Sequence, residues 1–460
     1  MDRTLDEKQS VDHFDKARTT IRTLAPELLS EIFTHCIVGL DDEYNVLDWT
    51  WIRCSSQAPL LLGRVCRRWR SVSISSPDLW CTFAIGGEAL SHVDLEKDLE
   101  ALKYWNSKSH SRPLSIRVYY HQSISYGTQL TPIIEYVVSQ SWRWKEIKLT
   151  YPFNFEYDVF APFQTRNLPQ LVMFQSETIG SEGSAEFVLS SAPRLQSLIY
   201  SGSGAHVDFS GGPHGIKQID IYDDLPMKKT NSVVDLFTCF TQCPLLEDLS
   251  MPLSIGEWEI SPRLPDELPS TIALTHLAHL NLWFLPEADP RLLFDRLFLP
   301  ALISLRIHIL GGKPAYADWP HVRTMLAHSR PPLHTLKLYM VPMKEATLVG
   351  CLAYIPTLTE LDVFGVVFSD YILESLTVDE ADANISASLC PWLQKVALWS
   401  RDYSERAMIE MIVSRRKHAL RTGFTEGIAL KSVTSGFDFD RIRSNPDIAE
   451  CVKDGLKISY

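Results

Sequence analysis

The sequence has no apolar run long enough to span a bilayer, because none approaches the roughly twenty residues that a membrane helix needs. It also has no excess of basic residues: 44 Lys and Arg stand against 56 Asp and Glu, giving a net charge of −12 over 460 residues. Phosphate binding needs a dense basic surface, so this charge argues against a nucleic-acid partner. The N-terminal segment is polar and charged, which does not fit a secretory signal. We therefore expect a soluble chain without membrane or nucleic-acid contacts.

The cysteines also show no pattern of disulfide or zinc-ligand pairs. The nine cysteines are an odd number scattered from Cys36 to Cys451, a pattern that predicts reduced thiols in the cytoplasm or nucleus. Cys239 and Cys243 lie four residues apart, but no second pair with zinc-ligand spacing accompanies them. We expect neither a metal nor a cofactor.

Catalytic motifs are missing as well. The chain has no G-x-S-x-G nucleophile turn and no P-loop, and the glycines between Gly202 and Gly212 lack the strand-then-helix setting of a phosphate cradle. His276 and His279 are predicted to point in different directions as surface residues. The basic cluster at 415–421 is explained by a favourable helix C-terminal charge. We predict that the protein is not an enzyme.

What the sequence does contain is one repeated phrase, L-x-x-L-x-L, often after a proline. Its first positions lie 21 to 35 residues apart, a spacing typical of a leucine-rich repeat with one strand and about one helix per unit. The clear copies begin at Leu195, Leu246, Leu277, Leu302, Leu333, Leu358 and Leu393, and weaker copies begin at Trp144, Leu171 and Ile216. Segments between them have helical periodicity, namely Val233–Phe240, Leu292–Phe298, Val322–Ala327 and Ala346–Tyr354. The pattern predicts an irregular α/β solenoid with parallel strands on the concave face and helices and loops on the convex face.

Two segments near the N-terminus each have the spacing of a helix with one apolar face. The first, LAPELLSEIF at Leu24–Phe33, follows Thr23 as a start signal and has Pro26 and Glu27 in its first turn. The second, LLLGRVCRRWRSVSISSPDL at Leu60–Leu79, places apolar residues on one stripe and arginines mostly on the other side. Two apolar faces in one small unit are hard to bury internally, so part of this surface should need a partner.

The wording of these segments, L-x-P-E-L-L-x-E-I-F and then V-C-R-R-W-R followed by S-P-D-L-W, resembles the F-box. The resemblance covers about Thr23–Phe83, and it departs from the family at Val38–Ala58, which is longer than the usual linker. Similar proteins, in which an F-box precedes a leucine-rich region, are common in basidiomycete fungi. The resemblance implies a substrate-receptor subunit that binds the Skp adaptor of a cullin-RING ubiquitin ligase.

The residues that the resemblance assigns to adaptor binding are Leu24, Pro26, Leu28, Leu29, Ile32, Phe33, Val65, Cys66, Trp69, Leu79 and Trp80. A second interpretation remains open from the residues themselves. The chain is then a leucine-rich-repeat scaffold outside any ligase, and the F-box remnant only caps the solenoid.

These patterns divide the chain into an N-terminal segment (1–22), an F-box (23–85) with an inserted loop (38–58), a linker helix (86–110) and a solenoid with a C-terminal cap (111–460). Glu88–Asn106 is the expected linker helix, strand-like Leu114–Tyr120 should start the solenoid, and Met408–Val413 should form a terminal helix. Asp41, Asp42 and Glu43 are expected in a solvated loop.

Residues that alternate with the buried positions of a strand must point to the concave surface. The position after the third aliphatic residue of each phrase gives Tyr222, Pro252, Trp283, His308, Tyr339, Phe364 and Trp399. The intervening position gives Asp220, Ser250, Asn281, Arg306, Lys337, Asp362 and Ala397. Because aromatic side chains anchor many interfaces, we predict that Tyr222, Trp283, His308, Tyr339, Phe364 and Trp399 bind the target protein. The alternative is that the protein's own loops or C-terminal tail cover this row, or that the strands have a different register.

Overall fold

The computed structural model describes residues 21, 23–37, 49–87, 94–120, 127–165, 167–179, 185–202, 204–223, 231–254, 270–284, 291–310, 318–378, 388–400, 403–421, 429–436 and 442–459. The chain forms two compact units, Met1–Val159 and Phe160–Tyr460, and each is described by itself. Within these described ranges, no helix combines the length and the apolar character that a bilayer crossing requires.

Among the described residues of the first unit, three short helices come first, α2 (Pro26–Thr34), α3 (Leu62–Val65) and α4 (Arg67–Ser75), followed by a 3-10 turn at Pro77–Trp80. Helix α2 starts with Pro26 in its first turn, as expected, but Ala25 occupies the N-cap position in place of Thr23 and makes no side-chain cap bond. The second predicted helix is interrupted at Cys66. Its backbone there is extended (φ −157°, ψ 170°), and its Sγ accepts a bond from the Trp69 N–H, so the residue ends α3 and caps α4.

A parallel sheet follows in the order β1 (Thr82–Gly86), β2 (Leu114–Tyr119) and β3 (Trp144–Pro152). Helix α5 (Leu95–Ser109) connects β1 to β2, and helix α6 (Thr131–Ser139) precedes β3. The sheet therefore starts one strand earlier than Leu114–Tyr120, and α5 lies within its first strand–helix–strand unit. The run at Phe83–Ile85 was missed because so short an apolar stretch does not distinguish a strand from the end of the preceding helical segment.

The end of the inserted loop is part of this unit. Trp51 forms a parallel bridge with Ala84 of β1, and the Ile52 N–H donates to the Ala84 carbonyl at 2.9 Å. The Trp105 indole N–H of α5 in turn donates to the Ile52 carbonyl at 3.0 Å. Trp49 and Ile52 are buried, so this segment extends the edge of the sheet. The predicted loop at Asp41–Glu43 and most of the N-terminal segment 1–22 lie outside the described residues.

The second unit contains a long parallel sheet with the strand order β4-β6-β8-β10-β12-β14-β15-β16-β17-β18-β19. The bounds are β4 (Met173–Ile179), β6 (Ser197–Gly202), β8 (Gln218–Asp223), β10 (Asp248–Ser254), β12 (His279–Phe284), β14 (Ser304–Ile309), β15 (Thr335–Tyr339), β16 (Glu360–Phe364), β17 (Lys395–Trp399), β18 (Ser432–Ser435) and β19 (Lys457–Ser459).

The register of this sheet follows the repeated phrase. Leu249 pairs with Leu280, and the same ladder continues through Leu305, Leu336 and Leu361 to Val396. The first, fourth and sixth positions of every clear copy are at most 3% exposed. The weaker copies also give buried strand positions, in β3, β4 and β8. The strand–helix repeat is thus confirmed as a solenoid-like α/β fold, because each strand buries its aliphatic face against its neighbours.

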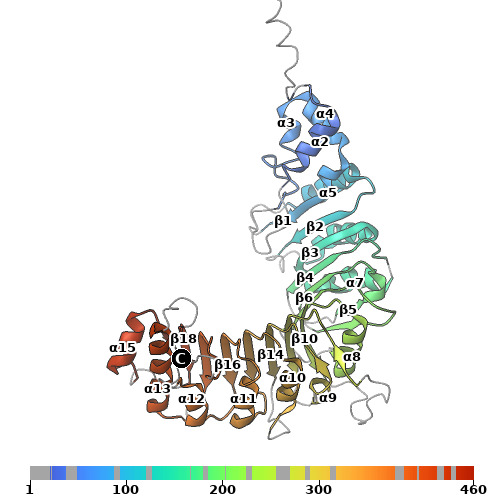
Figure 1. The fold of residues 1–460 in the computed structure, drawn as a ribbon. Coiled ribbons are helices and arrows are strands. Elements are labelled where there is room, and N and C mark those ends of the chain that lie inside the picture. Colours follow the sequence, from blue (N-terminus) through green and yellow to red (C-terminus); the bar gives the residue numbers. More distant parts are fainter. Residues whose placement is uncertain are drawn as a thin grey trace, which may run out of the picture. The chain divides into compact units, whose positions relative to one another are not determined.

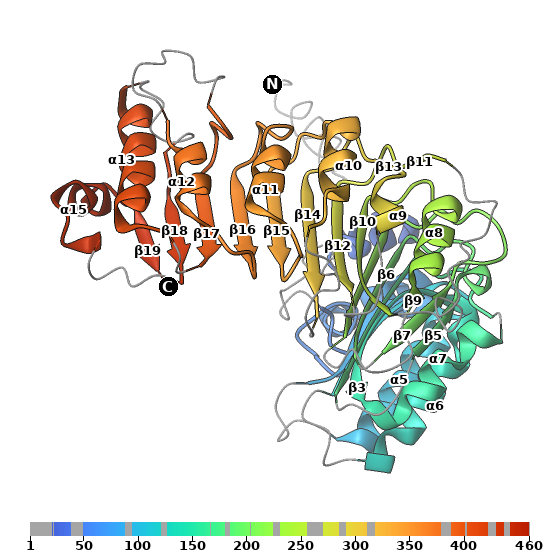
Figure 2. The ribbon, with the colours of Figure 1, turned by 90° about the horizontal axis from the view of Figure 1, so that it is seen from below.

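Helices cover one face of this sheet (Figures 1 and 2). They are α7 (Glu156–Gln164), α8 (Val233–Gln242), α9 (Arg291–Phe294), α10 (His321–Ser329), α11 (Glu345–Leu352), α12 (Asp370–Leu376), α13 (Glu405–Arg421) and α15 (Pro446–Lys453). The helices expected at Val233–Phe240 and Val322–Ala327 are present, and the one expected at Ala346–Tyr354 is present up to Leu352, where α11 ends. The one expected at Leu292–Phe298 is not whole, because it ends at Phe294 and Leu297–Phe298 forms strand β13, which pairs with β11 (Ile272–Ala273).

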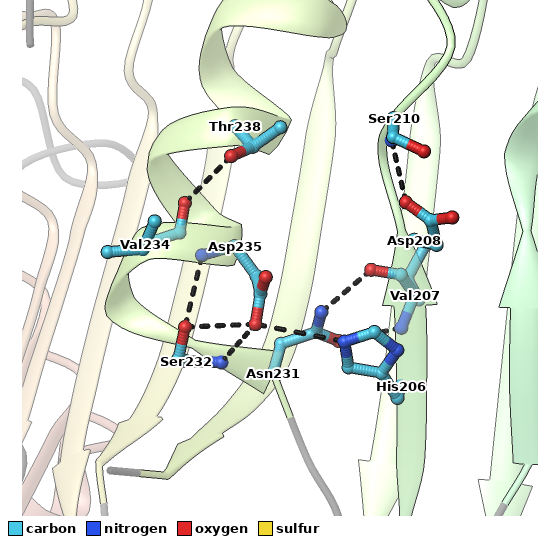
Figure 3. Close-up of polar contacts among 9 residues, drawn as sticks. All are labelled: His206, Val207, Asp208, Ser210, Asn231, Ser232, Val234, Asp235 and Thr238. Atoms are coloured by element: carbon cyan, nitrogen blue, oxygen red, sulfur yellow. Dashed lines mark hydrogen bonds and ion pairs between the residues drawn. The ribbon is translucent and has the colours of Figure 1, made fainter. Parts of the chain in front are cut away.

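A small second sheet of β5 (Ala185–Val188) and β7 (Ala205–Asp208) is joined to the start of α8 by one side chain. The Asn231 amide donates to the Val207 carbonyl at 2.8 Å and accepts from the Val207 N–H at 3.0 Å, as a neighbouring strand would (Figure 3). Ser232 and Asp235 then form a capping box that begins α8. These bonds satisfy buried backbone groups where the ladder of the main sheet does not reach.

The C-terminal region continues the sheet beyond the expected end of the repeats. Strands β18 and β19 add Val433 and Ile458 to the ladder of Val396, although the sequence phrase fades after Leu398. The fading has a local cause: Ser435 stands where earlier copies have an aliphatic residue, and the Tyr403 hydroxyl bonds to it. The predicted terminal helix at Met408–Val413 is part of the longer α13.

Candidate binding surfaces

Apolar side chains remain exposed on the N-terminal helices of the first unit. On α2, Leu28 is 55% exposed and Ile32 is 43% exposed, four residues apart on one side of the helix. Leu61 and Val65, at the two ends of α3, are 44% and 56% exposed. Pro26 and Cys66 are exposed as well. We call Pro26, Leu28, Ile32, Leu61 and Val65 the apolar helix surface.

Four of the predicted adaptor-binding residues lie in the core instead. Leu29, Phe33, Leu79 and Trp80 are at most 2% exposed. Phe33 packs on Trp69 with ring centroids 4.9 Å apart, and Trp80 packs on Trp105 at 5.0 Å. These four side chains stabilise the unit from within and offer no surface to a partner. Leu24 and Trp69 are half-buried at its margin.

In the second unit, the face of the sheet opposite the helices carries the two predicted columns. We call it the open face; it is the side of the strands away from helices α10–α13 in Figure 1. Pro252 pairs with Trp283, and the ladder runs on through His308, Tyr339 and Phe364 to Trp399. The intervening column, Asp220, Ser250, Asn281, Arg306, Lys337, Asp362 and Ala397, is in register in the same way. The structure therefore brings together all six residues predicted to bind the target.

Ring contacts divide this aromatic row into two groups, one from Tyr222 to Tyr339 and one of Phe364 with Trp399. The Tyr222 and Trp283 centroids lie 6.3 Å apart, Trp283 and His308 lie 5.6 Å apart, and His308 stacks on Tyr339 at 4.5 Å with an interplanar angle of 13°. Phe364 contacts Trp399 edge-on at 6.3 Å. Tyr222 and Phe364 are 52% and 42% exposed, and the other four are half-buried. Rings held by their neighbours lose little further freedom on binding, which suits them as anchors.

Asp362 of the intervening column joins Tyr339 to Trp399 by hydrogen bonds. The Asp362 carboxylate accepts bonds from the Tyr339 hydroxyl and, at 3.2 Å, from the Trp399 indole N–H. Lys337 pairs with Glu360 at 2.6 Å. Burial, together with the charge of Arg306, lowers the pKa of His308 to about 4, so its ring is neutral at pH 7. The row from His308 to Trp399 is therefore preorganised and carries no charge on its rings.

At the other end of the row, the open face is hollowed over strands β8, β10, β12 and β14. The cavity has a volume of about 270 Å³. Asp220, Asp248, His279, Asn281 and Arg306 contribute its polar walls. We call it the charged pocket. The predicted columns already contained Asp220, Asn281 and Arg306. They did not predict a cavity, because the curvature of the sheet depends on several strands together and the sequence of one repeat does not determine it.

The remaining candidates have structural roles. Cys239 and Cys243 are buried, and burial raises the pKa of the Cys239 thiol. Among the described residues, no group of histidine, cysteine and carboxylate side chains could hold a metal ion. His279 lies 3.8 Å from Asp248, whereas His276 precedes the strand.

Two members of the basic cluster on α13 bond to other helices rather than act at their own helix end. Arg415 and Arg416 are 4% and 8% exposed. Arg415 donates to the Leu376 carbonyl at the end of α12, and Arg416 donates to the Cys451 and Asp454 carbonyls at the end of α15. The two guanidinium groups satisfy C-terminal carbonyls of the neighbouring helices.

Comparison with known proteins gives no further guide: no protein-family model matches the chain, and a search of curated proteins finds no match.

Proposed function

We propose that the chain is the substrate-receptor subunit of a Skp-cullin-F-box type ubiquitin ligase, as the F-box resemblance of its N-terminal helices implies. The apolar helix surface docks the adaptor, and the open face of the leucine-rich repeats holds a target protein. The chain then contributes proximity between the target and a ubiquitin-charged enzyme, and no catalytic group of its own. It acts in the cytoplasm or the nucleus.

The observation that carries this proposal is the division of the two N-terminal helices. Leu29 and Phe33 are sealed in the core, yet Leu28 and Ile32, one position earlier in each pair, point to solvent. Side chains of this size lower the free energy by about 1.5–3 kcal/mol each when they are fully buried. A surface that leaves four of them open on two short helices supports docking to an apolar partner.

The test is copurification of the full-length chain with a Skp-family adaptor. Leu28→Glu combined with Val65→Glu places charges on exposed positions, and we expect a loss of affinity of roughly a hundredfold or more, because each removes an apolar anchor. The matched control is Val367→Glu in the second unit, where the side chain is 75% exposed; it should bind like the original chain. Circular dichroism should show all variants folded. Unchanged adaptor binding by the double variant would refute docking through this surface.

A second function is favoured by the packing of the same helices on the sheet. Trp80 of the 3-10 turn packs on Trp105 of α5, and the Trp105 indole donates to the Ile52 carbonyl, so the segments that flank the N-terminal helices cover one end of the first unit as a cap would. In this case the protein is a scaffold whose partner is structural. Failure of the original, folded chain to bind any adaptor tested, with target binding through the open face retained, would favour the scaffold.

A further inference from the structure

At its β8–β10 end, the charged pocket contains two carboxylates with few or no hydrogen-bond and ion-pair partners among the described residues. Asp220 makes no hydrogen bond or ion pair with any described residue. Asp248 has only His279, with 3.8 Å between the carboxylate oxygen and the ring nitrogen. Burial, together with the nearby charges of Glu247 and Asp220, raises the pKa of Asp248 despite that histidine. Two neighbouring carboxylates that are partly desolvated are stabilised by a cation.

A neutral acceptor lies beside the two carboxylates. The Asn281 amide donates to the Ser250 hydroxyl at 3.3 Å, and this leaves its Oδ1 buried and without a hydrogen-bond partner. A buried acceptor without a donor costs free energy, which a ligand that supplies N–H groups recovers. The pocket thus presents acceptors to its occupant at this end. An ammonium or guanidinium group supplies three to five donors together with the missing positive charge.

The β14 end of the pocket carries a positive charge. Arg306 on β14 is exposed and has no ion pair with any described residue. Its neighbour on the next strand, Lys337, is already paired with Glu360. Arg306 lies two strands from Asp248 and three from Asp220, which is roughly 10–14 Å at the usual strand spacing. In an extended peptide, residues i and i+4 lie on one face and are separated by about the same distance.

The size of the pocket and the rings beside it fit a single long side chain. About 270 Å³ is below the roughly 300–1,000 Å³ of pockets that enclose drug-sized molecules. Tyr222 and Trp283 stand two residues further along the strands that carry Asp220 and Asn281, so they flank the acidic end. Aromatic faces attract both the alkyl stem of lysine or arginine and its cationic group.

We propose that the charged pocket binds a lysine or arginine side chain of an extended target segment against Asp220 and Asp248, while Arg306 pairs with an aspartate or glutamate about four residues away. This inference rests on the proposed function, since it takes the open face as the target-binding surface. It specifies the target by chemistry: a basic and an acidic residue at that spacing, with an apolar residue to lie on the aromatic row.

The probe is a display library of random twelve-residue peptides, selected on the purified full-length chain. We expect the bound peptides to be enriched in Lys or Arg at one position and in Asp or Glu about four residues away. An enriched peptide should lose roughly 30-fold or more in affinity towards the Asp220→Asn, Asp248→Asn variant, and towards Arg306→Gln, because each leaves a desolvated charge unpaired. The matched control is Lys395→Gln, on the open face but outside the pocket, and it should bind as the original chain does.

A second selection on Arg306→Glu should replace the acidic residue of the peptide by a basic one. Peptides without the charge pair, or peptides whose affinity none of the pocket variants changes, would overturn the inference, as would a library that yields no binder. These outcomes do not touch the adaptor copurification, which uses the other unit. Adaptor binding without charge-paired peptides therefore rejects only the pocket's specificity, whereas loss of adaptor binding rejects the ligase proposal itself.

Discussion

His308 on the open face is a neutral ring that packs between two aromatic side chains. His308 is held between Trp283 and Tyr339, and it faces the charges of Arg306, Lys337 and Asp362. Because burial disfavours its protonated form, the ring stacks as a neutral group at physiological pH. The stack from Trp283 through His308 to Tyr339 therefore carries no charge on His308 at physiological pH.

This charge state predicts a pH dependence. As the pH falls below the ordinary histidine pKa of 6.5, His308 in the unfolded chain takes up a proton, but in the folded chain it does not until about pH 4. The unfolded state binds more protons in this window, so stability should fall as the pH drops from 6.5 to 4. Urea unfolding at a series of pH values should show a shallower decline for His308→Phe. Replacement of the exposed His334 by Phe should leave the slope unchanged, and equal slopes for both variants would contradict the assignment.

Two buried arginines stabilise the packing of the C-terminal helices. Arg416 joins α13 to the carbonyls that end α15, and Arg415 does the same for α12. From the sequence alone, both were attributed to a favourable charge at the C-terminal end of their own helix. The carbonyls to which they donate belong to other helices, and the sequence around the two arginines does not predict those partners.

At the scale of elements, the turn after each strand limits how closely the next strand can approach. Gly365 follows β16 with φ +87°, and a Cβ there would lie 2.6 Å from the Met340 Sδ and 2.9 Å from the Met340 Cα. A side chain at this position would therefore meet both an unfavourable backbone conformation and the backbone that follows β15.

Gly365→Ala should destabilise the strand pair by more than about 1 kcal/mol. Gly455→Ala is the matched control: its φ of +95° imposes the same backbone penalty, but a Cβ there meets nothing within 4 Å. Amide hydrogen exchange should show faster opening at β15 and β16 in the first variant, and a smaller, local effect near β19 in the second. Equally small, local effects in the two variants would mean that Met340 can accommodate a side chain at position 365 and that the clash adds no cost.

The N-terminal helices show how an element can be predicted while its orientation is not. The spacing of Leu28, Leu29, Ile32 and Phe33 predicted α2 and its apolar side, but the apolar arc is wide enough to face in two directions. Contact with Trp69 decides that Phe33 is inside. The break at Cys66 was also unpredictable, because no proline or glycine stands there and the residue caps α4 through its own sulfur.

At the scale of the whole molecule, α13 and β18 cover the last repeats that the sequence phrase defines. Helix α13 covers Ile372, Leu373 and Leu376 of α12, which are fully buried, and β18 covers the edge of β17. An uncovered edge with the sequence Lys-Val-Ala-Leu-Trp would present apolar side chains and free backbone groups.

Deletion of residues 401–460 should therefore produce soluble oligomers or aggregates, measured by size-exclusion chromatography with light scattering. Deletion of 457–460 alone removes β19 and uncovers β18, which is short and mostly Ser and Thr, so that variant should remain a monomer. A monomeric, folded protein after the longer deletion would show that the repeats need no cap at this end.

The sequence by itself determined the repeat, the strands and the columns of the open face, because a strand alternates its faces every second residue and each copy of the phrase states its own register. Only the tertiary structure decided which apolar side chains of the N-terminal helices are sealed, where the sheet begins and ends, and that Asp220, Asp248 and Arg306 enclose a pocket. Those properties depend on which segments pack against one another when they are far apart in the sequence. Local periodicity shows that a side chain is apolar and on which side of its element it lies, but it does not show which segment packs on it.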